Sequence, residues 1–400
     1  MRLRELGAVS KTEGVPGIWR AVHTDSDCRG KGLIAQWMKE AGLQVREDCF
    51  GNIYGRLEGE VPETILTGSH VDTVKNGGLY DGACGVATAV SAVGALVKAG
   101  WKPHYSVEII GIEEEEGSRF DLLYPGSRAI VGHLLTEELD SRDENGIVLK
   151  ELMEEKGYDW KRISEADRRG DVKEFIELHI EQGAVLEKEG LSIGLVEHIT
   201  GMMKADVAIY GEQNHAGTTP MYLRKDPVVK TAELILNMTE RVKEISRSAV
   251  ITIGELDLQP NVSNVIPGRV HFVIDMRDGD GAALLDAKKA VERIIHSAED
   301  DGFRTELKIY SYKEPVSLDA GLVDCLEEAA REAGAAYKRM NSGAGNDSMA
   351  IAGEIPTCMI FIPSVDGISH SPQEYTRPED LGWGCEVLGR LLVKRAKGRK

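Results

Sequence analysis

The chain has 400 residues, of which 42% are hydrophobic and 28% are charged, and its formal net charge at pH 7 is -18. This composition is ordinary for a folded globular protein, and the length exceeds what one hydrophobic core usually organises, so we expect two domains. The negative charge repels phosphate backbones and no Lys/Arg cluster offsets it, which argues against a nucleic-acid partner.

The N-terminal sequence MRLRELGAVSKTEGVPG lacks the apolar core of a signal peptide. No later apolar run approaches the roughly 20 residues that span a bilayer, so no membrane partner is expected. The six cysteines are scattered without a C-x-x-C pair, which favours reduced, mostly buried thiols over a disulfide framework or a zinc ribbon. Together these features predict a cytoplasmic protein.

Short apolar runs alternate with helical segments in the first half of the chain. Residues 30–45 have apolar side chains at helical spacing, 63–73 predict a strand followed by a loop, 85–100 a helix of small residues, and 104–112 a second strand. This alternation predicts an α/β fold with a mainly parallel sheet flanked by helices. In such a fold, sites form at the carboxyl ends of the strands.

The pattern changes near residue 201. Residues 202–312 predict a strand, a helix, two strands, a helix and a strand, which would make a compact α/β sandwich. The earlier pattern resumes near residue 316, with a helix over 322–334, a Gly-rich loop over 341–350, a strand over 357–363 and a loop over 364–376. We therefore expect a discontinuous domain, 1–203 and 316–400, with an inserted domain over 204–315.

Candidate metal ligands follow several predicted strands. Taken singly, each has a plain structural alternative, such as a solvated charge run, a surface loop or a histidine in an edge strand. Period-2 geometry places His179 and Glu181 on one face of an extended segment, with Gln182 pointing away. The candidates in the first and last parts of the chain are His70, Asp81, the glutamate run 113–116, His179 and His370.

These candidates are stronger together, because each lies near the end of a predicted strand of one domain. Two histidines and a carboxylate are enough protein for one hydrolytic metal ion. Three histidines and two carboxylates suffice for two ions that share a bridging carboxylate. A carboxylate such as Asp72, two residues from His70, can fix the far nitrogen of a histidine ligand.

An ordered series of motifs runs over about residues 60 to 380: GSHVDT, GGLYDGACGV, EEGSRF with GSRAIVG, ELHIEQG, GEQNHAGTTPM, SNVIPG with DMRDGD, SGAGND and GISHSPQE. This series resembles the hydantoinase/carbamoylase amidases of the M20 metallopeptidase clan. The family includes N-carbamoyl-L-amino acid hydrolases, allantoate amidohydrolases and β-ureidopropionases. The resemblance implies a bimetal catalytic domain and a smaller inserted lid domain that forms a homodimer.

The resemblance implies roles for particular residues of the catalytic domain. One divalent metal ion (Zn, Mn, Co or Ni) would be held by His70, Asp81 and His179, and a second by Asp81, Glu116 and His370. Asp81 would bridge the two ions, and the Asp81–Gly82 peptide is expected to be cis. A bridging water would be the nucleophile and Glu115 the general base. Glu113 and Glu114 would then be ordinary charges at the strand end or outside the ligand set.

Further roles concern the substrate. His215 would reach into a partner subunit's site and polarise the scissile carbonyl, Asn264 and Arg277 would grip the substrate carboxylate, and Gln182 would hydrogen-bond the substrate. Without the resemblance, a turn histidine, an Asx-turn and a surface ion pair would be the preferred interpretations of the first three.

Three residues would support the ligand set without binding metal: Asp72, Asn346 and Asp347. Asn346 departs from the family pattern, which usually has histidine there, so a titratable group is replaced by a neutral amide.

The leading hypothesis is a metal-dependent amidohydrolase that cleaves the ureido C–N bond of an N-carbamoyl-L-amino acid or of allantoate, a small-molecule ureido acid, and releases ammonia and carbon dioxide. An aminoacylase or dipeptidase of the same clan, acting on N-acyl amino acids or small peptides, is the first alternative. A binding protein that keeps the scaffold without catalysis is the second, although neither the general base nor a metal ligand is missing.

Overall fold

The computed structural model describes residues 1–11, 14–120 and 122–398. The chain forms two compact units: unit 1 comprises Met1–Glu197 and Ser317–Lys400, and unit 2 comprises His198–Val316. The first division falls before the one expected after residue 203, because strand β7 (Gly201–Tyr210) already pairs in the sheet of unit 2.

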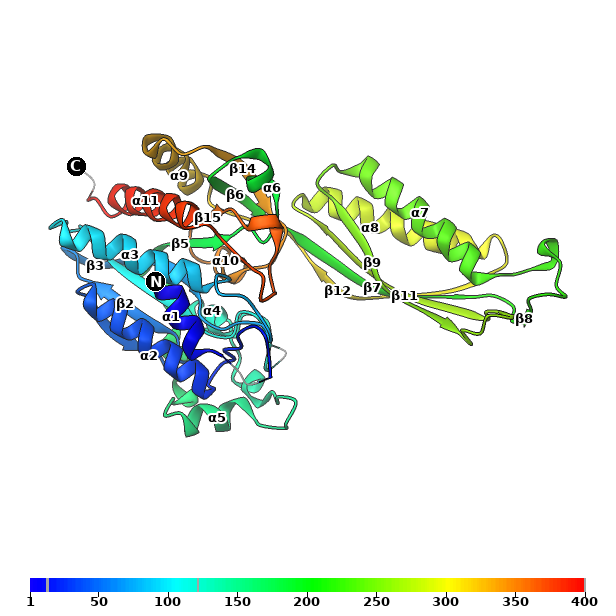
Figure 1. Ribbon diagram of the computed structural model, residues 1–400, viewed down its shortest axis with the longest axis horizontal. Helices are drawn as coiled ribbons and strands as arrows, with labels where there is room; N and C mark the ends of the chain where they lie inside the picture. The colour runs from blue at the N-terminus through cyan, green and yellow to red at the C-terminus, as the bar shows by residue number, and fades with distance from the viewer. Residues whose placement is uncertain (12–13, 121, 399–400) are drawn as a thin grey trace. The chain divides into compact units, whose positions relative to one another are not determined.

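A large sheet forms the centre of unit 1 (Figure 1). Its order is β1-β2-β4-β3-β5-β15-β6-β13, and β14 pairs with β6. The neighbouring strands β4, β3, β5 and β15 run parallel, and they are almost wholly buried, as parallel strands covered by helices must be. The α/β class with a mainly parallel sheet is thus confirmed. The strands are β1 (Gln44–Glu47), β2 (Ile53–Leu57), β3 (Val61–His70), β4 (Tyr105–Ile112), β5 (Val172–Ile180), β6 (Ile193–Ile199), β13 (Val316–Ser317), β14 (Tyr337–Ser342) and β15 (Thr357–Ile362).

Helices cover this sheet. α3 packs on β3 and β5 and against α11, while α9 and α11 pack on β15 (Figure 1). The helix expected over 30–45 ends at Glu40, because Gly42 takes a positive φ of 86° and the chain continues as β1. None of the helices in the described residues has both the length and the apolar content that a membrane span requires. The helices of unit 1 are α1 (Arg2–Val9), α2 (Asp25–Glu40), α3 (Ala83–Lys98), α4 (Pro125–Ile130), α5 (Leu149–Glu155), α6 (Val185–Glu189), α9 (Ala320–Ala333), α10 (Asp347–Ile351) and α11 (Pro378–Arg395).

Unit 2 is a four-stranded antiparallel sheet in the order β12-β7-β11-β9, with two helices side by side along it (Figure 1). The residues of β11 alternate between buried and half-buried, which is the pattern of a sheet with one face packed on helices. A short ribbon of β8 and β10 is separate from this sheet. The elements are β7 (Gly201–Tyr210), β8 (Asn214–His215), α7 (Pro227–Ile245), β9 (Val250–Gln259), β10 (Val265–Ile266), β11 (Arg269–Asp278), α8 (Gly281–His296) and β12 (Arg304–Lys313).

The six cysteines are free thiols, as expected, but most of them are not buried. Only Cys84 and Cys358 lie in the core, and Cys28 is exposed. The prediction of mostly buried thiols is therefore wrong, because the other cysteines lie on helices or loops with one face toward solvent.

Candidate metal centre

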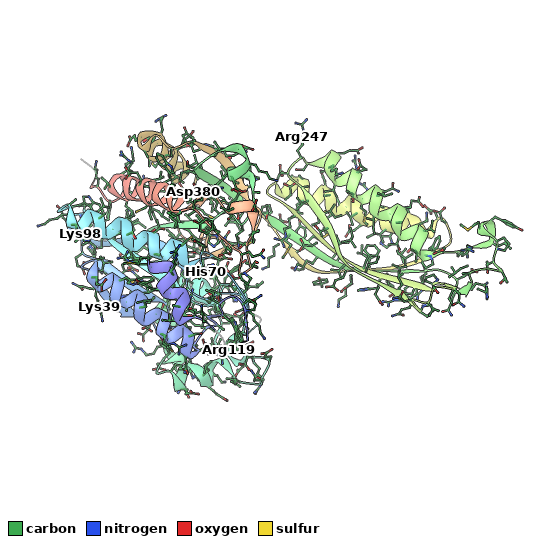
Figure 2. The ribbon with its side chains drawn as sticks, in the orientation of Figure 1. Lys39, His70, Lys98, Arg119, Arg247 and Asp380 are labelled. Atoms are coloured by element: carbon green, nitrogen blue, oxygen red, sulfur yellow. The ribbon has the colours of Figure 1, made fainter. Side chains whose placement is uncertain are left out.

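The ends of four parallel strands bring the candidate ligands together. His70 is the last residue of β3, and His179 is the penultimate residue of β5. The glutamate run begins directly after β4, and His370 lies in the loop after β15. Because β4, β3, β5 and β15 are neighbours, their carboxyl ends share one edge of the sheet. Figure 2 labels His70 at this edge.

Asp81 lies at the centre of the cluster and uses its two oxygens in different directions. His179 Nε2 lies 3.1 Å and His70 Nε2 lies 3.6 Å from Asp81 Oδ1. His370 Nε2 lies 3.1 Å from Asp81 Oδ2 and 3.6 Å from Glu116 Oε2. Three sets of potential ligand atoms each fall within 4.8 Å of one another: His70, Asp81 and His179; His70, Glu115 and Glu116; and Asp81, Glu116 and His370.

The electrostatics of the cluster would couple the binding of a cation to the release of protons. Burial raises the pKa of Glu115 well above its ordinary value, and burial together with the charge of Asp81 raises the pKa of Glu116 to about 7. Burial lowers the pKa of His70, but the charge of Glu115 and the hydrogen bonds to Asp72 and Asp81 outweigh it and raise that pKa well above its ordinary value. Carboxylates and histidines bind a metal ion only in their deprotonated forms. A divalent ion would therefore displace these protons and stabilise the ionised carboxylates and the neutral histidine.

The donor set also fits a metal ion. The Oε1 atom of Glu116 is buried and accepts no hydrogen bond from the described residues. Imidazole and carboxylate together suit Zn, Mn, Co or Ni. The residues present could therefore hold a divalent ion.

Asp72 supports the cluster from behind. His70 Nδ1 lies 3.1 Å from the carbonyl oxygen of Asp72 and 3.5 Å from its Oδ1. The Asp72 carboxylate also accepts hydrogen bonds from the backbone N–H groups of Glu115 (3.0 Å) and Glu116 (3.1 Å). His179 Nδ1 lies 2.8 Å from the carbonyl oxygen of Ile180. Such contacts fix the ring orientations of histidine ligands, and here they also fix the two glutamates.

Gly82 allows the Asp81 carboxylate to approach His70. Its φ is 59°, and a Cβ atom there would overlap the His70 ring. The expectation of a cis peptide at Asp81–Gly82 is wrong, since the cis bond recorded in the described residues is Gln259–Pro260.

Comparison with known proteins identifies the family. The sequence model of peptidase family M20/M25/M40 matches residues 66–394. The chain belongs to peptidase family M20/M25/M40. It is 39% identical to an N-carbamoyl-L-amino acid amidohydrolase of Geobacillus stearothermophilus over 99% of this chain and 98% of that protein. It is also 39% identical to an allantoate amidohydrolase of Bacillus subtilis (strain 168) over 95% of this chain and 93% of the relative.

A solved structure agrees with these relatives. A hydantoinase/carbamoylase family amidase from Burkholderia multivorans superposes with a TM-score of 0.93 at 33% identity, covering 100% of this chain and 97% of the other. The resemblance drawn from the motifs is therefore confirmed at the level of the family.

The first half of the glutamate run in this M20 chain is not an ordinary pair of charges. Glu113 is fully buried, with its Oε1 2.6 Å from Lys31 Nζ. Glu114 is also buried, has a φ of 57°, and accepts hydrogen bonds from the N–H groups of Arg119 (3.2 Å) and Phe120 (3.0 Å). Both residues do lie at the strand end and outside the three groups of potential ligands, as expected, but they are not ordinary solvated charges, because β4 delivers them into the interior.

Gln182 does not point away from the histidines. β5 ends at Ile180, and Gln182 has a φ of 57°, so period-2 geometry no longer holds. Its Nε2 donates to Asp81 Oδ2 at 3.0 Å and lies 3.3 Å from His370 Nε2. Glu181, expected beside His179, instead accepts hydrogen bonds from the N–H groups at the start of α6.

Asn346 and Asp347 are buried at the start of α10. Asp347 Oδ1 accepts a hydrogen bond from the Ser127 hydroxyl at 2.7 Å, and burial raises the pKa of Asp347 to about 8. Asn346 Oδ1 accepts from the Ser342 hydroxyl at 3.1 Å, while its Nδ2 has no hydrogen-bond partner among the described residues. A neutral amide with a remaining donor thus occupies this position.

The other candidates belong to unit 2. His215 is exposed, and its Nδ1 accepts hydrogen bonds from the N–H groups of Gly217 (2.9 Å) and Thr218 (3.3 Å). The N–H of Ala216 donates to the carbonyl of Asn264 at 3.0 Å, which places His215 and Asn264 side by side.

Arg277 lies near the opposite end of β11 from Asn264, and its guanidinium contacts both oxygens of Asp275 (2.9 and 3.1 Å). Arg277 lies eight positions beyond Arg269 along the strand, or roughly 27 Å. Unit 2 therefore does not bring Asn264 and Arg277 together as a gripping pair, because the extended strand between them holds them apart.

Three residues around the site are not among the candidates that the sequence indicates. Lys31, on α2, pairs with Glu113 from far along the chain, and no local pattern marks it. Tyr124 has a φ of 54°, and its hydroxyl fills the space where a Cβ of Gly345 would lie. Glu374 is the last residue of the motif GISHSPQE, and this position is the signal in the sequence that could have marked it as part of the site.

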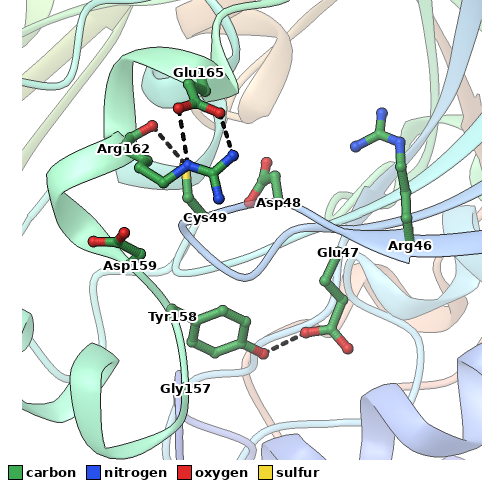
Figure 3. Close-up of a pocket in the computed structure, with 9 residues that line it drawn as sticks. All are labelled: Arg46, Glu47, Asp48, Cys49, Gly157, Tyr158, Asp159, Arg162 and Glu165. Carbon is green, nitrogen blue, oxygen red and sulfur yellow. Dashed lines mark hydrogen bonds and ion pairs between the residues drawn. The ribbon is translucent and has the colours of Figure 1, made fainter.

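A cavity of about 440 Å³ in unit 1 contains none of the candidate ligands (Figure 3). Arg162 pairs there with Glu165, and the Tyr158 hydroxyl with Glu47. The cavity is lined by Arg46, Glu47, Asp48, Cys49, Gly157, Tyr158, Asp159, Arg162 and Glu165.

Proposed function

We propose that this M20 chain is a metal-dependent amidohydrolase that cleaves the ureido C–N bond of an N-carbamoyl-L-amino acid or of allantoate. One observation carries the proposal: three histidines and the Glu116 carboxylate converge around Asp81, beside a buried Glu115. The relatives named for N-carbamoyl-L-amino acids and for allantoate support the substrate class, since the chain matches both along nearly its whole length.

The residues divide into ligands and a base. We propose that His70, Asp81 and His179 hold one divalent ion and that Asp81, Glu116 and His370 hold a second. When bound, such ions lower the pKa of water toward neutrality and polarise a carbonyl. Glu115, with Oε2 4.0 Å from His70 Nε2, would take the proton and return it to the leaving nitrogen. Its raised pKa suits a group that must hold a proton for part of the cycle.

Substrate contacts are proposed to come from Gln182, His215, Asn264 and Arg277. A small ureido acid cannot span the roughly 27 Å along β11 between the two ends of unit 2. We therefore propose a homodimer in which His215 and Asn264 of one subunit serve the site of its partner.

Mixing two inactive variants tests the shared site. Combining His215→Ala protein with Glu115→Gln protein and allowing subunits to exchange should restore part of the activity, because one site of the mixed dimer has both groups intact. A monomer on size-exclusion with full activity, or a mixture that stays inactive after proven exchange, would contradict the shared site.

A substrate panel tests the reaction. Purified protein, with Mn, Co, Ni or Zn added, should release ammonia from allantoate or from N-carbamoyl-L-amino acids, with β-ureido acids assayed in parallel. Absence of ammonia from every ureido acid with every metal would refute the proposal.

Asn346 keeps a second function open, because it replaces a histidine that the resembled amidases usually have. An aminoacylase or dipeptidase of the same clan would release amino acid from N-acyl substrates or peptides but not from N-carbamoyl substrates. Ninhydrin detection with N-acetyl and N-carbamoyl forms of the same amino acids separates the two functions.

A further inference from the structure

Two loops that supply candidate ligands meet at one buried carboxylate, that of Glu374. One loop follows β3 and carries Asp81, and the other follows β15 and carries His370. Glu374 lies four residues beyond His370 and is 4% exposed.

The Glu374 carboxylate accepts hydrogen bonds from both loops. Its Oε1 accepts from the backbone N–H groups of Tyr80 (2.8 Å) and Asp81 (3.0 Å). Its Oε2 accepts from the hydroxyl of Ser369 at 2.9 Å, and Ser369 directly precedes His370. Ser369 Oγ also lies 3.3 Å from Asp81 Oδ2. These contacts fix the backbone of Asp81 against the loop that presents His370.

The surrounding chain is shaped for this carboxylate. A Cβ atom at Gly78 would overlap the Glu374 side chain, so only glycine allows the approach. Beside it, the rings of Tyr80 and Tyr375 pack edge to face with centroids 5.7 Å apart. Two N–H groups converge on one oxygen and a hydroxyl on the other, an arrangement that an acceptor-only carboxylate satisfies completely.

His370 depends on its loop more than the other histidines do. His70 and His179 lie on strands, and each Nδ1 contacts a nearby backbone carbonyl. His370 lies in a loop rather than on a strand, and its φ of 53° is in the left-handed region, which is uncommon for residues other than glycine although histidine adopts it more often than most. Its loop is tied to the Asp81 loop through Glu374.

We propose that Glu374 is a positioning residue that sets the spacing between Asp81 and His370. It thereby controls cation binding by the group of Asp81, Glu116 and His370 more strongly than binding by the group of His70, Asp81 and His179. The inference shares with the proposed function only the premise that these groups bind divalent ions, and it does not depend on which bond is hydrolysed.

Mn²⁺ binding to the full chain tests this role, with free Mn²⁺ followed by electron paramagnetic resonance. Wild-type protein should bind two ions. Glu374→Ala should bind one of them about 10–100-fold more weakly, the usual cost of losing a residue that supports a metal ligand. Glu374→Gln should fall between the two, because its amide oxygen still accepts from Tyr80 and Asp81. The matched control is Glu386→Ala, which removes an exposed carboxylate of α11 and should leave binding unchanged.

A second readout separates positioning from general support of the fold. The metal-free Glu374→Gln protein should melt within a few degrees of metal-free wild type while its weaker ion is still lost first. Equal binding of both ions by Glu374→Ala and wild type would overturn the inference. It would also be overturned if both Glu374→Ala and Glu374→Gln bound the two ions equally weakly and melted at a lower temperature. A wild-type protein that binds no Mn²⁺ would overturn it as well. Selective loss of one ion supports the inference even if no ureido acid is hydrolysed.

Discussion

Replacing Lys31 by Met tests whether one buried ion pair holds the glutamate run in place. The Lys31 and Glu113 side chains are 3% and 0% exposed, and their charged atoms are 2.6 Å apart. Met keeps much of the length of the lysine stem but removes the ammonium. The variant must then bury either an unpaired carboxylate or a protonated one.

The cost of the protonated form can be worked out. Burial and the charge of Asp27 already raise the pKa of Glu113 well above its ordinary value of 4.5, although Lys31 opposes them. Loss of Lys31 raises this pKa further, so a carboxyl that wild type ionises at pH 7 and the variant holds protonated costs at most about 3.4 kcal/mol more than in wild type, since each pH unit above 4.5 contributes about 1.36 kcal/mol. At pH 5 the same cost is about 0.7 kcal/mol. The unfolded chain releases the proton above pH 4.5 and the folded chain does not, so destabilisation grows as the pH rises.

Urea unfolding at pH 5, 6 and 7 measures this effect. We expect Lys31→Met to lose about 3–5 kcal/mol at pH 7, the range for removing one partner of a buried pair, and much less at pH 5. Lys39→Met is the matched control, because Lys39 is an exposed residue of the same helix (Figure 2) and should change stability by less than about 0.5 kcal/mol. A loss at pH 7 below about 1 kcal/mol, or equal losses at pH 5 and pH 7, would refute the reasoning.

Four further variants test the site. Glu115→Gln should keep its metal by elemental analysis while turnover falls by about 10²- to 10⁴-fold, and near-normal turnover would assign the base elsewhere. Gly82→Ala should weaken metal binding, because its Cβ would overlap the His70 ring; unchanged Mn²⁺ affinity would contradict this. Burial raises the pKa of Glu114 to about 8. Between about pH 4.5 and 8 the glutamate is ionised in the unfolded chain but protonated in the folded one, so wild type loses stability as the pH rises. Relative to wild type, Glu114→Gln should therefore gain unfolding free energy over this window and match wild type below it. Arg277→Lys should raise KM more than it lowers kcat, and an unchanged KM would remove Arg277 from the substrate site.

Much of the fold and of the ligand set could be predicted from the sequence, because both follow from local patterns. The apolar runs over 63–70 and 104–112 became β3 and β4, and the small-residue segment became α3. The candidate histidines were found by their positions after strands, and parallel strands necessarily present their carboxyl ends at a common edge. The order of the motifs then carried the family resemblance, which supplied the expected roles of the residues.

The remainder depended on contacts between distant residues. No residue near Glu113 in the sequence indicates that Lys31 will form an ion pair with it. The sequence therefore predicts ordinary charges at Glu113 and Glu114, half of the run of four glutamates. Gln182 was misplaced because the alternation of a strand gives no warning of a left-handed residue just beyond its end. The role of Asn264 and Arg277 in gripping the substrate carboxylate stays a prediction, and the resemblance behind it does not reveal that a long strand separates them within one subunit.

The order of the strands has a consequence for how the protein forms during synthesis. β15, which is made near the end of the chain, inserts between β5 and β6, which are made much earlier. Until residues 357–362 leave the ribosome, the edge of β5 that will pair with β15 is unpaired, and its apolar residues near His179 are exposed. Such an edge can pair with other chains. Completion of the ligand cluster and closure of that edge are therefore one late event. A chain that stalls before β15 would be both unable to assemble the full cluster and prone to aggregate.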